Sequence, residues 1–178
     1  GYTSANTNTR NLVNSSGVMS AAVSGAGSAR HDLAATGYGT PADGTAIMAY
    51  GYISGSTAVS NLVNNVGVVA SDTGGVGTAR QNLAAARYGA DKALFAFGSG
   101  AVNTRNLVSN SGVVAADASG AGTARFYVGA AMYGGDKAVI AFGTTNSDFL
   151  SLKNLVSNLG VVSADVTGVG TGRIQTAA

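Results

Sequence analysis

The sequence predicts an all-β protein, a β-propeller built from four blades of four strands each. Three observations lead to this fold class. A 20-residue segment recurs four times, short apolar runs end in glycine, and glycine-rich turns separate the remaining stretches. Four short strands repeated every 45–50 residues are typical of a propeller blade, whereas the coils of a solenoid repeat at about 20–30 residues.

The recurring segment begins with an Asn-Leu-Val triplet and ends with an arginine. The triplets start at residues 11, 61, 106 and 154, and the arginines stand at residues 30, 80, 125 and 173. The segment therefore keeps its length, while the connections between the copies vary. A rigid unit joined by variable loops is the simplest explanation.

An apolar run precedes three of the four triplets. It reads TAIMAYG at Thr45–Gly51, KALFAFG at Lys92–Gly98 and KAVIAFG at Lys137–Gly143. Apolar residues on both faces predict a strand that is buried on both sides, and a run this short is not typical of a helix. The large side chains of these runs are expected to form a core between adjacent blades: Ile47, Met48, Tyr50, Phe95, Phe97, Ile140 and Phe142.

A hairpin is expected next in each repeat. In the third copy it runs from TRNLVS (Thr104–Ser109) through the turn Asn110–Gly112 to VVAAD (Val113–Asp117). The glycine that closes this turn fits a residue with positive φ in a short hairpin loop. A second glycine-rich turn follows, for example TGGVG at Thr73–Gly77.

The fourth stretch starts at the arginine and is rich in alanine. It reads RHDLAATGYG at Arg30–Gly39, RQNLAAARYG at Arg80–Gly89 and RFYVGAAMYG at Arg125–Gly134. Alanine favours helix, but these runs are short, and glycine and aromatic residues follow them. We predict strands whose small side chains let a neighbouring sheet approach closely.

We expect one repeat domain over residues 1–178, with blades at approximately 1–39, 40–89, 90–134 and 135–178. The chain opens with Gly1 instead of Met, so we expect a processed chain or part of a longer one. Three arrangements stay open: a four-bladed ring, a segment of a larger ring, and a ring completed by another copy. An open array exposes sheet edges and apolar faces, which favours contact with identical or neighbouring chains.

Composition excludes several functional classes. Charged residues make up 10% of the chain, against roughly 25% in typical domains, and the net charge of +2 is too small to indicate a nucleic-acid surface. The absence of cysteine excludes disulfides and thiolate chemistry. No apolar stretch approaches the roughly 20 residues of a membrane span, and no signal peptide is recognisable.

Aspartate and arginine recur with a separation of eight residues. Such pairs predict either an ion pair that braces a turn or a ring of arginines that binds an acidic glycan. In the first copy the place of the aspartate is taken by Ala22, so Arg30 needs another partner. The three expected turn pairs are Asp72–Arg80, Asp117–Arg125 and Asp165–Arg173.

Tyrosine recurs before glycine at Tyr38, Tyr88 and Tyr133. These side chains are candidates for stacking on sugars, and they equally suit packing at the rim of a core. The loops around residues 55–57, 100–103 and 144–147 vary in length, and variable loops on a rigid scaffold are where recognition is expected.

The sequence offers no convincing catalytic or cofactor site. His31, the single histidine, has only Asp32 beside it, and neighbours on one strand do not supply triad geometry. One aspartate in each glycine-rich loop is too few for a calcium site. No helix with a Lys-Ser/Thr pair follows these loops, as a phosphate-binding loop requires. We expect no metal, no cofactor and no enzymatic activity.

The pattern resembles the Kelch-type β-propeller repeat. An apolar strand ending in glycine, an asparagine-containing strand, a glycine turn and an arginine before a small-residue strand carry the resemblance, as in TARQNLAAARYG at Thr78–Gly89. Two features depart from that family. A single glycine replaces its double glycine, and Val113–Val114 stands where its tryptophan is expected.

The sequence from Tyr133 to Arg173 also resembles glycine-rich Kelch-like arrays in virion proteins of marine bacteriophages. This resemblance implies a non-enzymatic structural protein of a phage tail or fibre, located in the virion outside any cell, whose partners are its own copies or neighbouring virion proteins. The alternative is a secreted lectin or adhesin whose loops bind glycans. A fold by itself does not decide between these functions.

Overall fold

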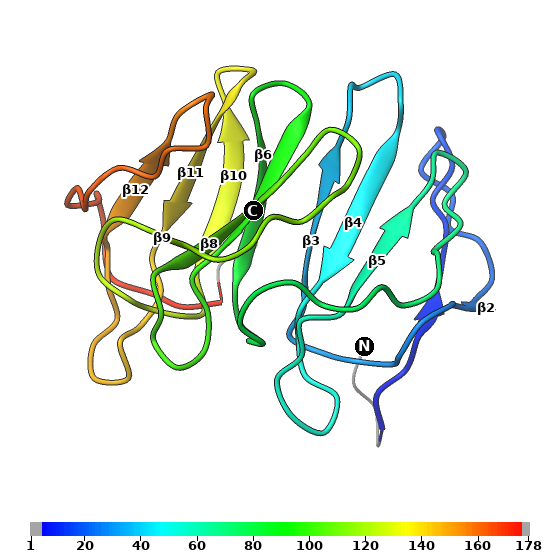
Figure 1. The fold of residues 1–178 in the computed structure, drawn as a ribbon, viewed down its shortest axis with the longest axis horizontal. Coiled ribbons are helices and arrows are strands. Elements are labelled where there is room, and N and C mark those ends of the chain that lie inside the picture. Colours follow the sequence, from blue (N-terminus) through cyan, green and yellow to red (C-terminus); the bar gives the residue numbers. More distant parts are fainter. Residues whose placement is uncertain (1–4, 176–178) are drawn as a thin grey trace.

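The computed structural model describes residues 5–175, and this range contains strands, turns and loops but no helix. The strands form four antiparallel sheets, shown in Figure 1. The N-terminal sheet contains β1 (Thr9–Arg10) and β2 (Val23–Ser24). The second sheet contains β3 (Ala34–Tyr38), β4 (Thr45–Ala49) and β5 (Ser60–Val63). The third contains β6 (Ala84–Tyr88), β7 (Lys92–Ala96), β8 (Thr104–Val108) and β9 (Ala118–Ser119). The fourth contains β10 (Gly129–Tyr133), β11 (Lys137–Ala141) and β12 (Lys153–Val156).

The all-β prediction is confirmed. The apolar runs form β4, β7 and β11, and the alanine-rich stretches form the strands β3, β6 and β10. These strands begin four residues after the arginine, so the arginine itself lies in the preceding loop. In β6 the exposed fraction alternates along the strand, with Ala84, Ala86 and Tyr88 buried, which is the two-residue period of a strand that packs one face on a core.

The third stretch of each repeat forms less strand than predicted. In the third sheet it provides an isolated bridge between Val108 and Val114, and then the two residues of β9. The side chain of Asn106 explains the interruption, because its Nδ2 donates to the carbonyl of Ala115 at 3.0 Å. A side-chain amide thus takes an acceptor that a continuous ladder would have used. The expected turn is present, and Gly112 has a φ of 82°.

The second, third and fourth sheets begin with the alanine-rich strand and not with the apolar one. The pairs β3–β4, β6–β7 and β10–β11 are antiparallel hairpins, and the expected blade limits at 39/40, 89/90 and 134/135 fall inside their turns. The sheets are therefore displaced by one strand from the expected limits. The reason is local: a few turn residues after the tyrosine bring the apolar run back along the alanine-rich strand.

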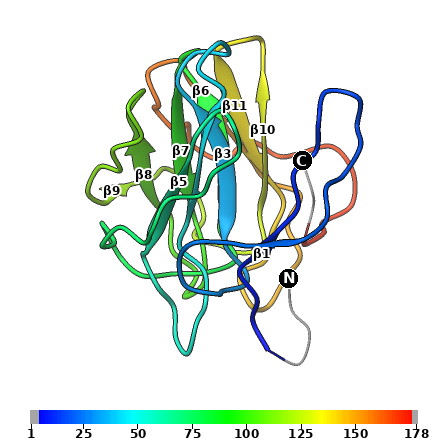
Figure 2. The same cartoon turned by 90° about the vertical axis from the view of Figure 1, so that its right-hand side faces the viewer.

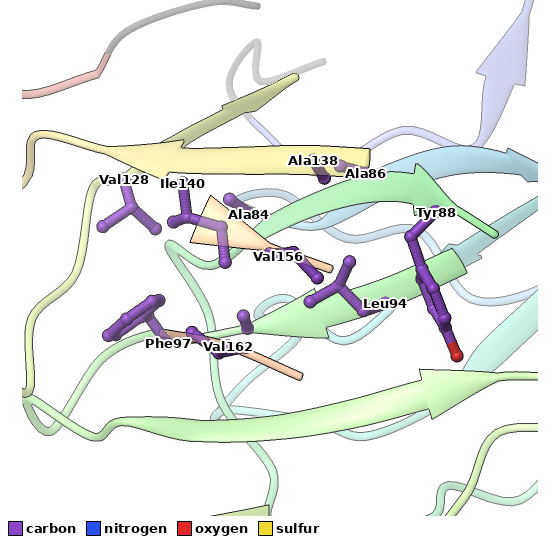
Figure 3. Close-up of a cluster of buried hydrophobic side chains, with 11 residues drawn as sticks. Ala84, Ala86, Tyr88, Leu94, Phe97, Val128, Ala138, Ile140, Val156 and Val162 are labelled. Atoms are coloured by element: carbon purple, nitrogen blue, oxygen red, sulfur yellow. The ribbon is translucent and has the colours of Figure 1, made fainter. Parts of the chain in front are cut away.

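The strands β3, β6 and β10 lie side by side, and the sheets spread from them like a fan (Figures 1 and 2). Hydrophobic cores fill the spaces between successive sheets, as predicted. Tyr50 and Phe95 belong to the core between the second and third sheets. Figure 3 shows the next core, between the third and fourth sheets, with Leu94 and Phe97 facing Ile140. Of the expected core residues, Met48 and Phe142 are only half-buried.

The described residues do not close into a ring. The N-terminal sheet lies at one end of the fan and the fourth sheet at the other (Figure 1). The sheets contain two, three, four and three strands along the chain, so four-stranded pairing is complete in the third sheet. The prediction of repeated antiparallel sheets is confirmed. In the second and fourth sheets, isolated bridges take the place of the outermost strand.

Candidate functional site: the junctions between repeats

The arginine of each recurring segment is buried where two sheets meet. Arg80 stacks over the ring of Tyr50, with its guanidinium carbon 4.1 Å from the ring centre. Its Nε donates to the carbonyl of Phe97 at 2.8 Å, and its Nη2 donates to Oδ1 of Asn106 at 2.7 Å. One side chain therefore contacts the residue that follows β4, the residue that follows β7, and a residue of β8.

The same geometry recurs one repeat later. Arg125 stacks over the ring of Phe97 at 4.2 Å, and its Nε and Nη2 donate to Phe142 and Asn154 at 2.7 and 2.6 Å. Charge-assisted hydrogen bonds of this kind are about twice as strong as neutral ones. The planar guanidinium suits the position because it stacks on a ring while its edge donates in several directions.

The asparagine of the Asn-Leu-Val triplet connects the arginine to the aspartate. Asn106 accepts from Arg80, and its Nδ2 donates to Oδ1 of Asp117 at 2.8 Å. Oδ2 of Asp117 accepts from the backbone N and the Oγ1 of Thr78 at 2.9 and 2.6 Å. We call this set, Thr78–Arg80–Asn106–Asp117, the junction network. It ties the loop before one sheet to the outer strands of that sheet.

The aspartates do not pair with the arginines expected from the spacing of eight. Asp72 lies 3.9 Å from Arg30, and Asp165 lies 3.7 Å from Arg125. Within residues 5–175 no ion pair joins Asp72–Arg80, Asp117–Arg125 or Asp165–Arg173. Instead, each hairpin carries its aspartate back toward the arginine of the preceding copy. Arg30 thereby obtains its partner, Asp72, from the second copy. The replacement of aspartate by Ala22 in the first copy therefore does not remove the partner of Arg30.

Burial decides between the two roles considered for the arginines. Arg30, Arg80 and Arg125 are buried, and burial lowers the pKa of Arg80, an effect that Tyr50 and Asp117 oppose. A buried guanidinium whose three nitrogens each donate to a protein acceptor is not available to an acidic glycan. The geometry therefore supports the bracing role for these three residues.

The candidate tyrosines divide into two buried residues and one exposed residue. Tyr88 is 3% exposed and Tyr38 is similarly buried, whereas Tyr133 is 40% exposed. The ring of Tyr38 lies against Gly112, and the ring of Tyr88 lies against Gly160, each in the hairpin turn of the following sheet. Packing between repeats is thus the role of Tyr38 and Tyr88. Tyr133 holds the equivalent position on the fourth sheet, and within residues 5–175 no turn of a further sheet covers it.

Sequence reasoning missed the asparagines. Asn61, Asn106 and Asn154 are buried and each donates to the aspartate eleven residues later. The signal was present, because the triplet keeps its asparagine in every copy, but an amide among strand residues does not reveal its partner. The serine or threonine two residues before the arginine was missed for the same reason.

No further chemical site stands out in the described part of the chain. His31 Nδ1 lies 3.0 Å from Oδ2 of Asp32, and its ring lies beside that of Tyr52, which is a local contact without the geometry of a triad. Among residues 5–175, no group of three or more His, Cys, Asp or Glu side chains is placed to hold a metal ion. The same range contains no helix able to cross a membrane.

The chain matches no protein-family model, and no curated protein is significantly similar to it. The resemblance to Kelch-type and phage repeats therefore stays a prediction made from the residues themselves.

The junction aspartates make the fold sensitive to acid. Burial acts to raise the pKa of Asp117, but hydrogen bonds from Thr78 and Asn106 outweigh it and hold the pKa below its ordinary value of about 3.9; the same balance holds for Asp72 and Asp165. A carboxyl with a lowered pKa in the folded state stabilises the fold above the unfolded-state pKa. That contribution is lost as pH falls through the folded-state value.

We therefore expect the free energy of unfolding to change little with pH between about 7 and 5 and to fall below about pH 4. Urea unfolding at a series of pH values measures this. The variant Asp117→Asn is expected to be less stable at neutral pH and to lose less stability on acidification. An acid dependence as steep as that of the parent would contradict the role given to Asp117.

Proposed function

We propose that this chain is a non-enzymatic structural module that assembles with copies of itself in the tail or fibre of a bacteriophage particle, its sheets serving as blades of a β-propeller. The single observation that carries the proposal is the exposure of apolar sheet faces at both ends of the fan. Apolar positions that are buried or half-buried in the inner copies are exposed at the two ends: Val13 and Met19 on the N-terminal hairpin, and Tyr133 and Leu155 on the fourth sheet. Val13 and Met19 line one hollow, Tyr133 and Leu155 line another, and exposed apolar side chains that gather in this way mark an interaction site.

The bracing of the junctions supports the same proposal. The repeats are joined by buried arginines and by cores that two sheets share, which is how repeat arrays gain stability from their neighbours. The resemblance of the repeats to virion arrays supplies the phage context. An antibody raised against this chain is expected to label the tails or fibres of intact particles of the phage that encodes it.

Self-association is the first expected outcome. Sedimentation velocity over a range of protein concentrations should show the average mass rising with concentration, because covering the end faces removes apolar surface from water. High salt should leave the association unchanged or strengthen it, since apolar burial is not screened. A chain that sediments as a monomer at every concentration would refute the assembly function.

A glycan-binding module is the second candidate, and one observation favours it. Loops at one edge of the second and third sheets enclose an open, polar hollow. Its lining includes Asp43, Asn64, Asn65 and Asn110 beside Tyr38. Amides and carboxylates hydrogen-bond to sugar hydroxyls, and an aromatic ring stacks on the C–H face of a sugar. Binding on a glycan array that is lost in Asn65→Ala and kept in Tyr133→Ala would place recognition at this hollow, and an array without signal would reject this candidate.

A further inference from the structure

The two exposed end faces are complementary halves of one interface that the chain already forms twice. Between the third and fourth sheets, Tyr88 and Leu107 of the third sheet lie against the turn glycine Gly160. An ideal Cβ at Gly160 would lie 2.9 Å from Tyr88 and 3.0 Å from Leu107. Between the second and third sheets, Tyr38 and Leu62 lie against Gly112 in the same way.

Two valines of the following sheet complete the internal interface. Val156 and Val162 of the fourth sheet are 1% and 5% exposed, and both belong to the core shared with the third sheet (Figure 3). Val108 and Val114 occupy the same positions in the preceding core. A junction therefore joins a tyrosine–leucine pair on one sheet to a glycine turn and two valines on the next.

The fourth sheet presents the first half of this interface, and no partner covers it among the residues that the structure describes. Tyr133 and Leu155 are both 40% exposed, and they line an apolar hollow together with Val156 and Val161. We call Tyr133, Leu155 and Arg173 the C-terminal face. Arg173 stacks over the ring of Phe142 at 4.0 Å, and its carbonyl accepts from Gly143 N at 2.9 Å, as the carbonyl of Arg125 accepts from Gly98 N.

The N-terminal hairpin presents the second half. Val13 and Met19, which form an antiparallel bridge, are 60% and 65% exposed, although their counterparts in the fourth sheet are buried. The turn glycine Gly17 has a φ of 77°, as Gly160 has, but no atom lies within 4 Å of its ideal Cβ. We call Val13, Gly17, Met19 and Asn11 the N-terminal face.

We infer that the C-terminal face of one copy binds the N-terminal face of a second copy, with Tyr133 and Leu155 on the Gly17 turn. This inference rests on the proposed function, and it specifies the partner and the register of assembly. The occupant is a second copy because each face lacks the partner that the other face supplies, and because the contact repeats two interfaces already present in the chain. The contact is head-to-tail, so an assembly of any size keeps one free face at each end and can grow.

The two ends of the fan together supply every polar residue of the junction network except the aspartate. Nδ2 of Asn11 donates to the carbonyl of Ser20 at 3.0 Å, just as Asn154 donates to Ser163, and no residue of the described chain donates to Oδ1 of Asn11. In the internal junctions this oxygen accepts from an arginine, the role that Arg173 of the other copy would fill. Ala22 stands where Asp165 stands in the fourth copy, so the new junction lacks its carboxylate.

Two variants with one blocked face each test the register. Val13→Asp places a carboxylate on the N-terminal face, and Leu155→Asp places one on the C-terminal face. Each variant alone is expected to associate about 10- to 100-fold more weakly than the parent chain, because a buried unpaired charge opposes binding. An equimolar mixture is expected to form a dimer and nothing larger, since such a pair has one intact junction.

The controls separate blocking from misfolding. Val113→Asp changes an exposed valine on the third sheet, which has the second and fourth sheets of the same chain on its two sides. This variant should therefore associate like the parent chain. A second pair, Met19→Asp with Tyr133→Asp, must give the same complementation if Leu155→Asp unfolds. A single blocked variant that associates like the parent chain, or a mixture of folded variants that stays monomeric, overturns the head-to-tail register.

Restoring the missing carboxylate is expected to strengthen the junction. Ala22→Asp should lower the dissociation constant by roughly tenfold, because it adds acceptors for Arg173 and Thr171 of the other copy. Ala21→Asp adds the same charge one residue away and should not. The gain should vanish in Ala22→Asp combined with Arg173→Ala, and a gain that survives this combination argues against the register.

These outcomes also separate the inference from the proposed function. A parent chain that never associates refutes both. A parent chain that associates, while both blocked variants associate equally well alone, leaves the assembly function standing and rejects the head-to-tail junction.

Discussion

Replacing Arg80 with alanine is expected to lower the free energy of unfolding by about 3–5 kcal/mol, a large part of the 5–15 kcal/mol typical of a domain. The guanidinium is buried, stacks on Tyr50, and is the donor to Oδ1 of Asn106. Its removal leaves that acceptor buried without its charged donor and opens a cavity between two sheets. Urea unfolding followed by circular dichroism measures the change.

Two further variants show whether the loss comes from the shape of arginine or from its charge. Arg80→Lys keeps the charge but cannot stack and donate in three directions, so it should recover only part of the lost stability. Lys92→Ala removes a cation whose ion pair with Asp91 lies at the surface, and its unfolding midpoint should match that of the parent chain. An Arg80→Ala variant as stable as Lys92→Ala would show that the junction network contributes nothing.

Replacing Gly122 with alanine should destabilise the protein by about 3–5 kcal/mol for a different reason. Gly122 has a φ of 95°, and a Cβ there would collide with the Asp165 carboxylate and lie 2.6 Å from Nδ2 of Asn154. The added methyl group thus combines backbone strain with displacement of two partners in a junction network. Chemical unfolding of the variant and of the parent chain provides the comparison.

The chain offers a matched control at Gly170. This glycine occupies the same place in the last copy with a φ of 98°, but no atom lies within 4 Å of its ideal Cβ. Gly170→Ala therefore carries the backbone strain alone and should cost about 1–2 kcal/mol. Equal losses at the two positions would mean that strain accounts for the whole effect and that contact with the network is unimportant.

The assembly proposal and the stability predictions depend on the same contact. Inside the chain, a tyrosine, a leucine and an arginine of one repeat meet a glycine turn, valines and an asparagine of the next. At the two ends the same residue types are exposed. Gly112→Ala, whose Cβ would lie 2.9 Å from both Leu62 and Tyr38, and Gly17→Ala, which meets no atom, form a further pair for comparing a filled junction with an open one.

Local sequence was enough to determine the inner strands of each repeat, the turns and most of the core, but not the third stretch, which forms little strand. The apolar runs predicted β4, β7 and β11, the short alanine tracts predicted β3, β6 and β10, and the hairpin glycine predicted the positive φ of Gly112. These features depend on neighbouring residues, since turn geometry and a two-residue apolar period are set within a few positions. Burial of Phe95 and Ile140 follows from the same patterns.

Only the tertiary structure decided which copy pairs with which. Asp165 faces Arg125 and not Arg173, and Tyr88 packs on a turn of the next sheet. The second, third and fourth sheets begin one strand earlier than the repeat pattern indicates. The physical reason is the repetition itself. When nearly identical segments recur, an aspartate has an equivalent arginine in its own copy and in the preceding copy. Which of the two it pairs with depends on how the hairpins fold back against the neighbouring sheet.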